Sequence, residues 1–217
     1  MKFVLLLAMG VLVSPAAPPD PNAAAKERYL AFGKCRKEIA ATFHSRTIER
    51  RLLFSIDVKP EVFQALFGDL GFAVKMARLH AKKLYEISNA GPYYKAWDGE
   101  RTWATIWPIH ADAESGTYVY FIQGVYKGGI TVSGSMVMEV SFQNRLGNTF
   151  FRIATYISID DPFMRELTQF LRNFKSFKDY LDRLIDGTVG EIRRVGFITA
   201  RGLVREGAPF PPRVSAP

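Results

Sequence analysis

The chain has 217 residues, and 48% of them are hydrophobic, a share that excludes a wholly disordered protein. Lysines and arginines number 29 against 21 aspartates and glutamates. The resulting net charge of +8 favours contact with anionic membranes, unless it is spread evenly and serves only solubility. No basic run with interleaved aromatic residues is present, so we expect no nucleic-acid partner. A single cysteine excludes an intramolecular disulfide, and three histidines without ligand spacing predict no metal and no cofactor.

The first residues are typical of an export signal. Met1 and Lys2 give a basic start, and the apolar run Phe3 to Val13 has the length of a signal core. The run is shorter than the about 20 residues that a membrane-spanning helix needs. We therefore expect residues 1–25 to be a signal peptide and linker, cleaved after Ala17 or within Ala23 to Ala25, and the protein to be periplasmic or secreted. An uncleaved buried helix is the alternative.

About 190 residues remain after the signal, which suits a single core, and residues 26–204 are expected to form one domain. Apolar residues recur three or four apart from Lys26 to Thr42, which predicts a leading helix. Cys35 lies in this helix and is interpreted as a small core residue. The proline-rich end, residues 205–217, is expected to be a disordered tail.

From Thr47 to Asp57 the hydrophobic period changes to two, which predicts a strand. Pro60 then suits the first turn of a helix, with Asp57 as a possible cap. A short helix is expected there, with a continuation over Phe72 to Leu79.

Six more strands are predicted, separated by turn residues such as Asp98-Gly99, a hairpin signal. Ile130 to Phe142 alternates most regularly, with Glu139 on a side that we expect to face water. These strands cover Lys83–Ser88, Tyr93–Trp97, Arg101–Ile109, Thr117–Tyr126, Ile130–Phe142 and Thr149–Ile159.

Asp161 and Pro162 then predict the start of a long closing helix that continues to about Ile185. Its apolar stripe includes several phenylalanines and requires a large concave partner. A further helical segment is expected from Glu191 to Thr199.

No catalytic motif is present, and we expect no enzymatic activity. Aromatic and methionine side chains on neighbouring strands, facing the closing helix, predict a wall suited to a hydrophobic ligand, although they suit a solid core equally well. Arg152, Glu139 and His110 are candidates for orienting a ligand head group, or they face water. The predicted ligand-binding residues are Trp103, Trp107, Tyr118, Tyr120, Met136, Met138, Arg152, Tyr156, Phe170, Phe174 and Phe177.

The stretch Phe54-Ser55-Ile56-Asp57-Val58-Lys59-Pro60-Glu61-Val62-Phe63-Gln64-Ala65-Leu66 resembles the first strand and helix start of the START-like (SRPBCC, Bet v 1-like) superfamily. Asp161-Pro162-Phe163 resembles the start of its last helix, and the likeness covers about Phe43 to Gly202. It implies an α+β helix-grip fold, in which a curved antiparallel sheet wraps around a long C-terminal helix and leaves an apolar cavity. The segment Gly187 to Leu203 extends beyond the usual closing helix.

The resemblance implies binding or carriage of a hydrophobic small molecule or lipid, such as a sterol, hopanoid or phospholipid, with transient contact to an anionic membrane. Two alternatives stay open. One is an enzyme of the polyketide cyclase or dehydratase kind that uses the same cavity, and the other is an interaction domain with a solid core.

Overall fold

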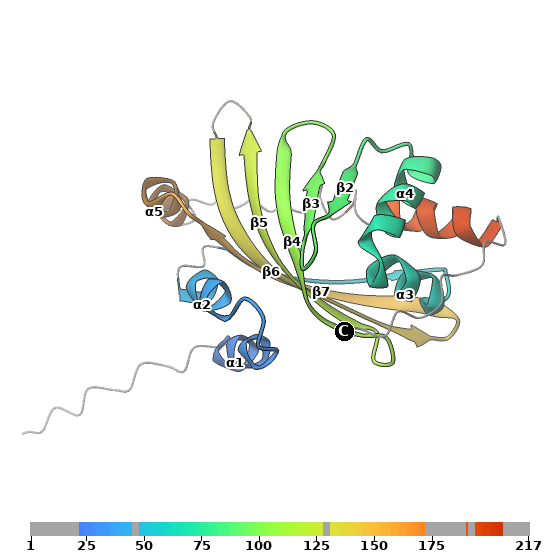
Figure 1. Ribbon diagram of the computed structural model, residues 1–217. Helices are drawn as coiled ribbons and strands as arrows, with labels where there is room; N and C mark the ends of the chain where they lie inside the picture. The colour runs from blue at the N-terminus through green and yellow to red at the C-terminus, as the bar shows by residue number, and fades with distance from the viewer. Residues whose placement is uncertain (1–21, 45–47, 128–130, 172–189, 191–193, 206–217) are drawn as a thin grey trace, which may run out of the picture.

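One curved antiparallel sheet organises the chain (Figure 1). The computed structural model describes residues 22–44, 48–127, 131–171, 190 and 194–205, without the side chains of residues 167–171. Within these residues the strands lie in the order β1-β7-β6-β5-β4-β3-β2, so β1 from the start of the domain pairs with the last strand. The strands are β1 (Ile48–Ile56), β2 (Glu86–Asn89), β3 (Tyr94–Trp97), β4 (Thr102–Asp112), β5 (Thr117–Lys127), β6 (Thr131–Arg145) and β7 (Asn148–Ile159).

All seven predicted strands are confirmed, and so are the α+β class and the open, curved sheet. The hairpin expected at Asp98-Gly99 joins β3 to β4, with Gly99 in the left-handed region at φ 89°. Alternation with period two places Phe54 and Ile56 of β1 on the same side as Phe151 and Ile153 of β7. The hydrophobic period of two therefore predicted the strands correctly.

Two helices follow β1 and cover one face of the sheet. α3 (Pro60–Gly68) starts at Pro60 as predicted, but the residue before it is Lys59, and Asp57 does not cap the helix. α4 (Leu70–Ala81) starts one residue after Asp69, whose carboxylate accepts a hydrogen bond from the Phe72 amide at 3.0 Å. This cap marks the start of α4 and separates it from α3.

The leading helix is in fact two helices, α1 (Ala23–Ala31) and α2 (Arg36–His44). Gly33 at φ 80° and Cys35 at φ 50° lie between them, and an α-helix cannot continue through that conformation. Figure 1 shows the pair on the side of the sheet opposite α3 and α4.

The sheet therefore carries a core on each face. One core lies under α3 and α4, whereas Tyr29, Ile39 and Phe43 of α1 and α2 pack on the other face. The side of β6 that was expected to face water is covered there, because Val137 is fully buried and Glu139 is 4% exposed. The prediction of a wet side was wrong at these positions.

α5 (Pro162–Leu171) begins where Asp161-Pro162 predicted, and the Met164 amide donates to the Asp161 carboxylate at 2.7 Å. The predicted continuation to Ile185 lies outside the described residues. Helical residues 194–205 pack beside α3 and α4, with Ala200 and Leu203 in the core beneath them (Figure 1). No helix among the described residues combines the length and the hydropathy needed to cross a membrane.

Candidate functional site

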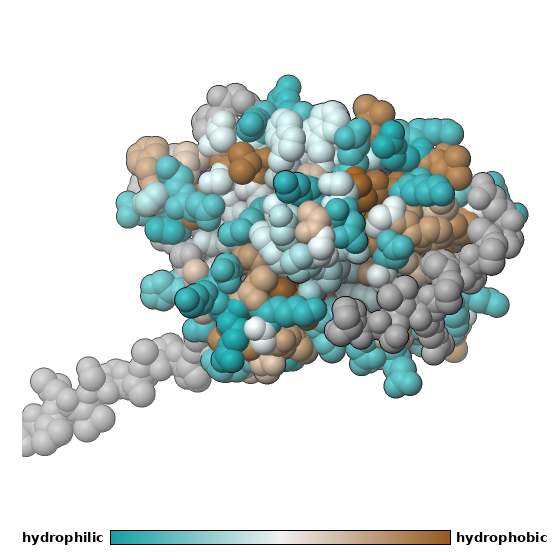
Figure 2. Space-filling view, viewed as in Figure 1, coloured by the Kyte–Doolittle hydropathy of each residue, from teal (hydrophilic) through white to brown (hydrophobic). Residues whose placement is uncertain are grey.

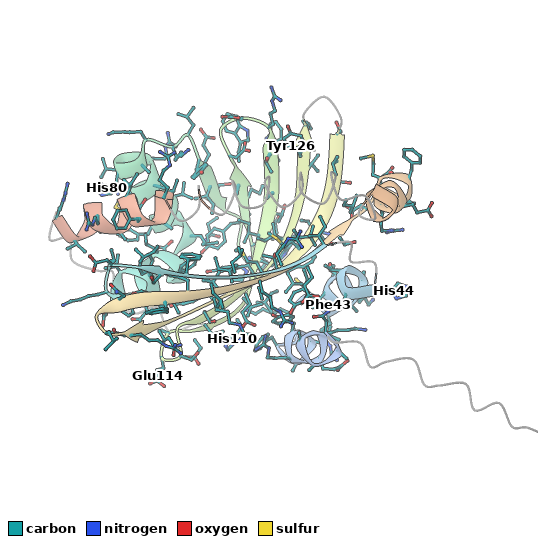
Figure 3. The ribbon with its side chains drawn as sticks, turned by 180° about the vertical axis from the view of Figure 1, so that it is seen from behind. Phe43, His44, His80, His110, Glu114 and Tyr126 are labelled. Carbon is teal, nitrogen blue, oxygen red and sulfur yellow. The ribbon has the colours of Figure 1, made fainter. Side chains whose placement is uncertain are left out.

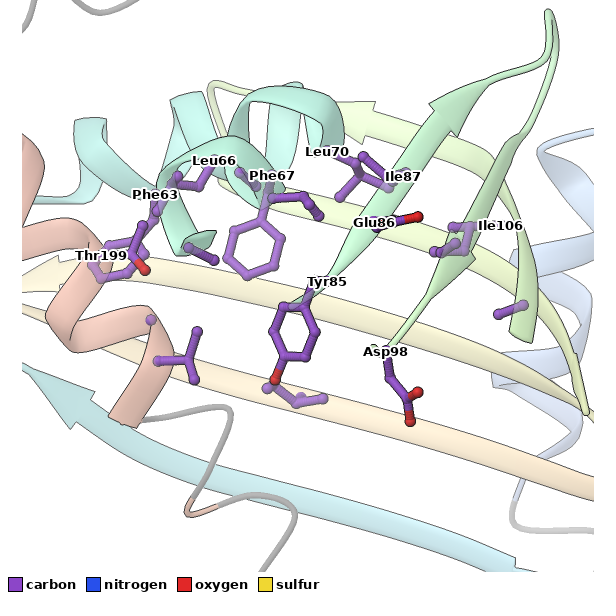
Figure 4. A pocket seen from close by; sticks show the side chains of 18 of the residues that line it. Phe63, Leu66, Phe67, Leu70, Tyr85, Glu86, Ile87, Asp98, Ile106 and Thr199 are labelled. Atoms are coloured by element: carbon purple, nitrogen blue, oxygen red, sulfur yellow. The ribbon is translucent and has the colours of Figure 1, made fainter. Parts of the chain in front are cut away.

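An apolar cavity lies between the sheet and the helices α3, α4 and 194–205 (Figure 4). Its volume is about 410 Å³, within the range of small-molecule binding sites. Strands β1 and β7 form one wall, and β2 to β4 form another. The described lining residues are Phe54, Ile56, Phe63, Leu66, Phe67, Leu70, Ala73, Val74, Ala77, Tyr85, Glu86, Ile87, Ala96, Trp97, Asp98, Thr102, Ala104, Ile106, Phe151, Ile153, Val195, Gly196 and Thr199.

Small side chains keep the cavity open where larger ones would close it. Ala96 and Ala104 pair across β3 and β4, and Ala73 and Ala77 lie one turn apart on α4. Large apolar side chains at these positions would fill the space that the aromatic residues of α3 leave. The cavity is thus a consequence of where the sequence places alanine.

Polar groups are few in the lining. Asp98, at the β3–β4 turn, accepts hydrogen bonds from the amides of Glu100, Arg101 and Thr102 at 2.8 to 2.9 Å. Burial tends to raise the pKa of Asp98, but these bonds and one from the Thr102 hydroxyl outweigh it, so the pKa is lowered. The carboxylate is therefore ionised at neutral pH. On another part of the lining, Thr199 is 2% exposed.

Tyr118 and Tyr120 were predicted to bind the ligand, and in the structure their hydroxyl groups bond to α3. The Tyr120 hydroxyl donates to the Phe67 carbonyl at 2.6 Å, and the Tyr118 hydroxyl donates to the Gln64 carbonyl at 3.3 Å. Burial raises the pKa of Tyr120, which keeps it a donor. Both rings lie in the core on the cavity side, and they hold the end of α3 on the sheet rather than lining the cavity.

Met138 packs against the same core, and Met136, two residues along β6, shares its face. Neither lines the cavity among the described residues. Trp103 is 43% exposed and stacks on Trp97 with 6.2 Å between ring centroids. Trp97 is the tryptophan among the described lining residues, but it pairs with Trp103, so its ring lies on the face of the sheet opposite the cavity-lining Ala96 and Ala104.

Three predicted ligand residues are directed away from the cavity. Trp107 and Tyr156 belong to the core under α1 and α2, and Arg152 is exposed on β7 between the cavity-lining Phe151 and Ile153. A strand turns successive side chains to opposite faces, so Arg152 cannot share the face of its two neighbours.

The candidates for an enzymatic role also lie on that opposite face. Glu139 accepts hydrogen bonds from the Tyr29 hydroxyl at 2.9 Å and from the Arg28 guanidinium. His110 stacks on Phe32 with 4.2 Å between centroids, beside the N-terminal helices (Figure 3). With Arg152 exposed on the same side, the structure brings none of the three into the cavity.

Phe170 lies on α5, but its side chain is outside the described set, as are Phe174 and Phe177. Their place beside a ligand stays a prediction. Figure 3 shows His44, His80 and His110 well apart. No group of three or more potential metal ligands occurs among the described residues.

No family model matches the sequence, and neither does any of the curated proteins. Several solved structures are similar in fold. Ara h 8.0201 is 15% identical over 73% of this chain and 98% of its own, with a TM-score of 0.46. XoxI from Bacillus cereus is 8% identical over 74% of this chain and 99% of its own, with a TM-score of 0.45. DynU16, from the dynemicin biosynthetic locus, is 11% identical over 74% of this chain and 48% of its own, with a TM-score of 0.38.

Similarity at these identities concerns the shape of the fold alone. The START-like resemblance inferred from the sequence is confirmed as a resemblance of fold, because the helix pair α3 and α4 follows β1 and β1 pairs with the last strand.

Proposed function

We propose that this protein binds a hydrophobic ligand, a lipid by class, in the cavity between the sheet and α3, α4 and residues 194–205, and that it carries this ligand. The observation that supports the proposal is the size of a nearly all-apolar cavity, about 410 Å³. Without a ligand, the apolar walls of this cavity are in contact with water, which is unfavourable.

A ligand that fills the cavity removes these walls from water, and each methylene group that it buries contributes about 0.8 kcal/mol. No chemical step is needed for such a function. The side chains named for the enzymatic alternative are Glu139, His110 and Arg152. All three lie on the other face of the sheet.

We further propose that the protein is exported and that cleavage follows Ala17. Ala23 to Ala25 form the first turn of α1, and Asn22 is buried and donates to the Glu49 carboxylate at 2.7 Å. Cleavage within the alanines would remove these contacts, whereas cleavage after Ala17 leaves them intact.

The outer surface of α4 is suited to an anionic membrane. From Gly71 to Tyr85 the chain has four lysines or arginines and no carboxylate, and Leu79 and Leu84 are 48% and 67% exposed. We call Lys75, Arg78, Leu79, Lys82 and Leu84 the α4 surface. Figure 2 shows hydrophobic residues, in brown, reaching the surface on this side of the molecule.

Cations attract acidic lipid head groups, and exposed leucines enter the interface. Because Ala73 and Ala77 of the same helix line the cavity, a membrane on the α4 surface would lie next to the ligand site.

Ligand binding can be tested with the uncharged fluorescent probe N-phenyl-1-naphthylamine and delipidated protein. Ala104→Phe places an aromatic ring in the cavity, and Ala111→Phe adds the same ring to an exposed position of the same strand, β4. We expect the wild type and Ala111→Phe to bind the probe, and Ala104→Phe to bind at least tenfold more weakly. Absence of binding by the wild type, or equal binding by both variants, would refute the proposal.

Membrane contact can be tested by co-sedimentation with vesicles of phosphatidylcholine alone or with 30% phosphatidylglycerol. The charge reversals Lys75→Glu and Arg78→Glu, made together, should reduce binding to the anionic vesicles at least tenfold. Arg36→Glu with Lys37→Glu changes the net charge equally on exposed positions of α2 and should have a much smaller effect. Equal losses in the two double variants would show that only net charge matters and would exclude the α4 surface.

A further inference from the structure

A groove of about 500 Å³ lies between α4 and β2, the strand at the edge of the sheet. Its described lining residues are Gly71, Val74, Lys75, Arg78, Leu79 and Ile87. Val74 and Ile87 also line the apolar cavity, so the groove adjoins the cavity along these two side chains. Ile87 pairs with the cavity-lining Ala96, which places both on the same face of the sheet.

The spacing of residues along α4 explains how one helix borders both spaces. Residues three or four apart share a face of a helix. Ala73 and Ala77 face the cavity, whereas Lys75 and Arg78 belong to the neighbouring stripe and face the groove. Val74 lies on the border between the two stripes. A ligand can therefore pass from the cavity to the groove without leaving the surface of α4.

The charged side chains of the groove are of one sign. Lys75 and Arg78 are exposed, and neither makes an ion pair with a described residue. The described lining of the groove contains no carboxylate. Like charges three residues apart on a helix repel each other, and an anion between them relieves that repulsion. Asp69 lies by Gly71, toward the other end of the groove, so an anion is favoured at the Arg78 end.

The cavity and the groove suit different parts of one molecule. The described lining of the cavity contains no lysine, arginine or histidine, and most of it is apolar, as an acyl chain requires. A volume of about 410 Å³ is in the lower part of the range for small-molecule sites and suits one chain better than the two of a diacyl lipid. The head group then lies beyond Val74 and Ile87, in the groove, where it stays hydrated and meets two cations.

We propose that the ligand is a lipid with a single chain and an anionic head, a carboxylate or a phosphate monoester, and that the head lies in the groove between α4 and β2. This inference rests on the proposed ligand-binding function and adds the class of lipid and the place of its head. Lys75 and Arg78 position the head, and the guanidinium of Arg78 can donate two parallel hydrogen bonds to either acid. The contact needs no membrane, which separates it from the docking proposed for the α4 surface.

The inference can be tested with four compounds that share one chain: laurate, dodecyl phosphate, dodecan-1-ol and dodecylamine. Each displaces N-phenyl-1-naphthylamine at pH 8, in the absence of vesicles. At least one of the two anions should displace the probe at a concentration at least fivefold lower than dodecylamine, and the tighter anion identifies the acid. If dodecylamine competes as well as both anions, the inference is refuted while ligand binding stands. If the wild type binds no probe at all, the proposed function fails as well.

Variants assign the preference to the groove. Lys75→Gln with Arg78→Gln should weaken binding of the tighter anion three- to tenfold, a modest effect because exposed ion pairs are weak. The same variant should bind dodecan-1-ol as the wild type does, which also shows that it is folded. Arg36→Gln with Lys37→Gln removes the same charge from exposed positions of α2 and should leave both affinities unchanged. An unaltered ratio of anion to alcohol affinity in the groove variant, or an equal change in both double variants, would overturn the inference.

Discussion

The imidazole of His80 lies so close to Gly202 that a Cβ on the glycine would come within 2.3 Å of the ring Cγ and Nδ1. His80 is near the end of α4, and Gly202 belongs to helical residues 194–205, so this contact joins two of the helices that enclose the cavity (Figure 3). Glycine permits the close approach because it has no side chain to displace the ring.

Gly202→Ala should therefore destabilise the protein by about 1–3 kcal/mol, as expected when a packed interface receives an extra methyl group. Gly196→Ala is the matched control in the same helix, because its Cβ would meet nothing within 4 Å. That variant should gain about 0.5–1 kcal/mol, since alanine is the better helix former. Urea unfolding of both variants measures the difference, and two gains of similar size would show that the helices are not in contact at Gly202.

The sequence predicted the sheet well because period two, turn residues and Pro60 are local signals. It could not predict that α1 and α2 cover the second face of the sheet. Glu139 shows why. A polar residue that alternates with apolar ones gives the same sequence pattern whether its side chain faces water or bonds to a buried partner such as Tyr29. Only the tertiary structure distinguishes the two cases.

The cavity was harder to predict than the fold. Tyr118, Tyr120 and Met138 were placed on the correct face, but the space lies nearer β2, β3 and the helix of residues 194–205. Alanines define that space, but an alanine in a strand is as typical of a tightly packed core as of a cavity wall. Trp97 could have been found from its position beside the Asp98-Gly99 turn, whereas Thr199 has no local signal.

Buried tyrosines should make the protein sensitive to alkali. Burial, followed by the charge and hydrogen bond of Glu139, raises the pKa of Tyr29, and burial also raises the pKa of Tyr120. A raised pKa in the folded state means that the stabilisation is complete below the unfolded value, about pH 10, and is lost as the pH rises above it. The free energy of unfolding should therefore fall steeply above pH 10.

Denaturant unfolding between pH 8 and pH 11 tests this expectation. Tyr29→Phe and Tyr120→Phe should each reduce the slope above pH 10, because each removes one titrating group. Tyr126→Phe is a suitable control, as Tyr126 is 46% exposed. A slope that all three variants share with the wild type would contradict the assignment to the buried hydroxyls.

The contact between Glu139 and Tyr29 should couple the N-terminal helices to the sheet. Glu139→Ala leaves the Tyr29 hydroxyl buried without its acceptor, at an expected cost of about 1–3 kcal/mol. Adding Tyr29→Phe to that variant should cost less than the sum of the single changes, because the unpaired hydroxyl is gone. A double-mutant cycle in urea measures this coupling, and strict additivity would show that the two side chains do not interact.

Tryptophan fluorescence should report where the ligand binds. Trp97 lines the cavity, whereas Trp107 lies under α1 and α2, with 5.5 Å between its ring centroid and that of Phe121. Dodecan-1-ol, which does not fluoresce, should change the emission of the wild type because it fills the cavity that Trp97 borders. Trp107→Phe should retain most of that change, and Trp97→Phe should lose it even at alcohol concentrations that still saturate the site. If the change follows Trp107 instead, the ligand binds on the other face of the sheet, between the strands and the N-terminal helices.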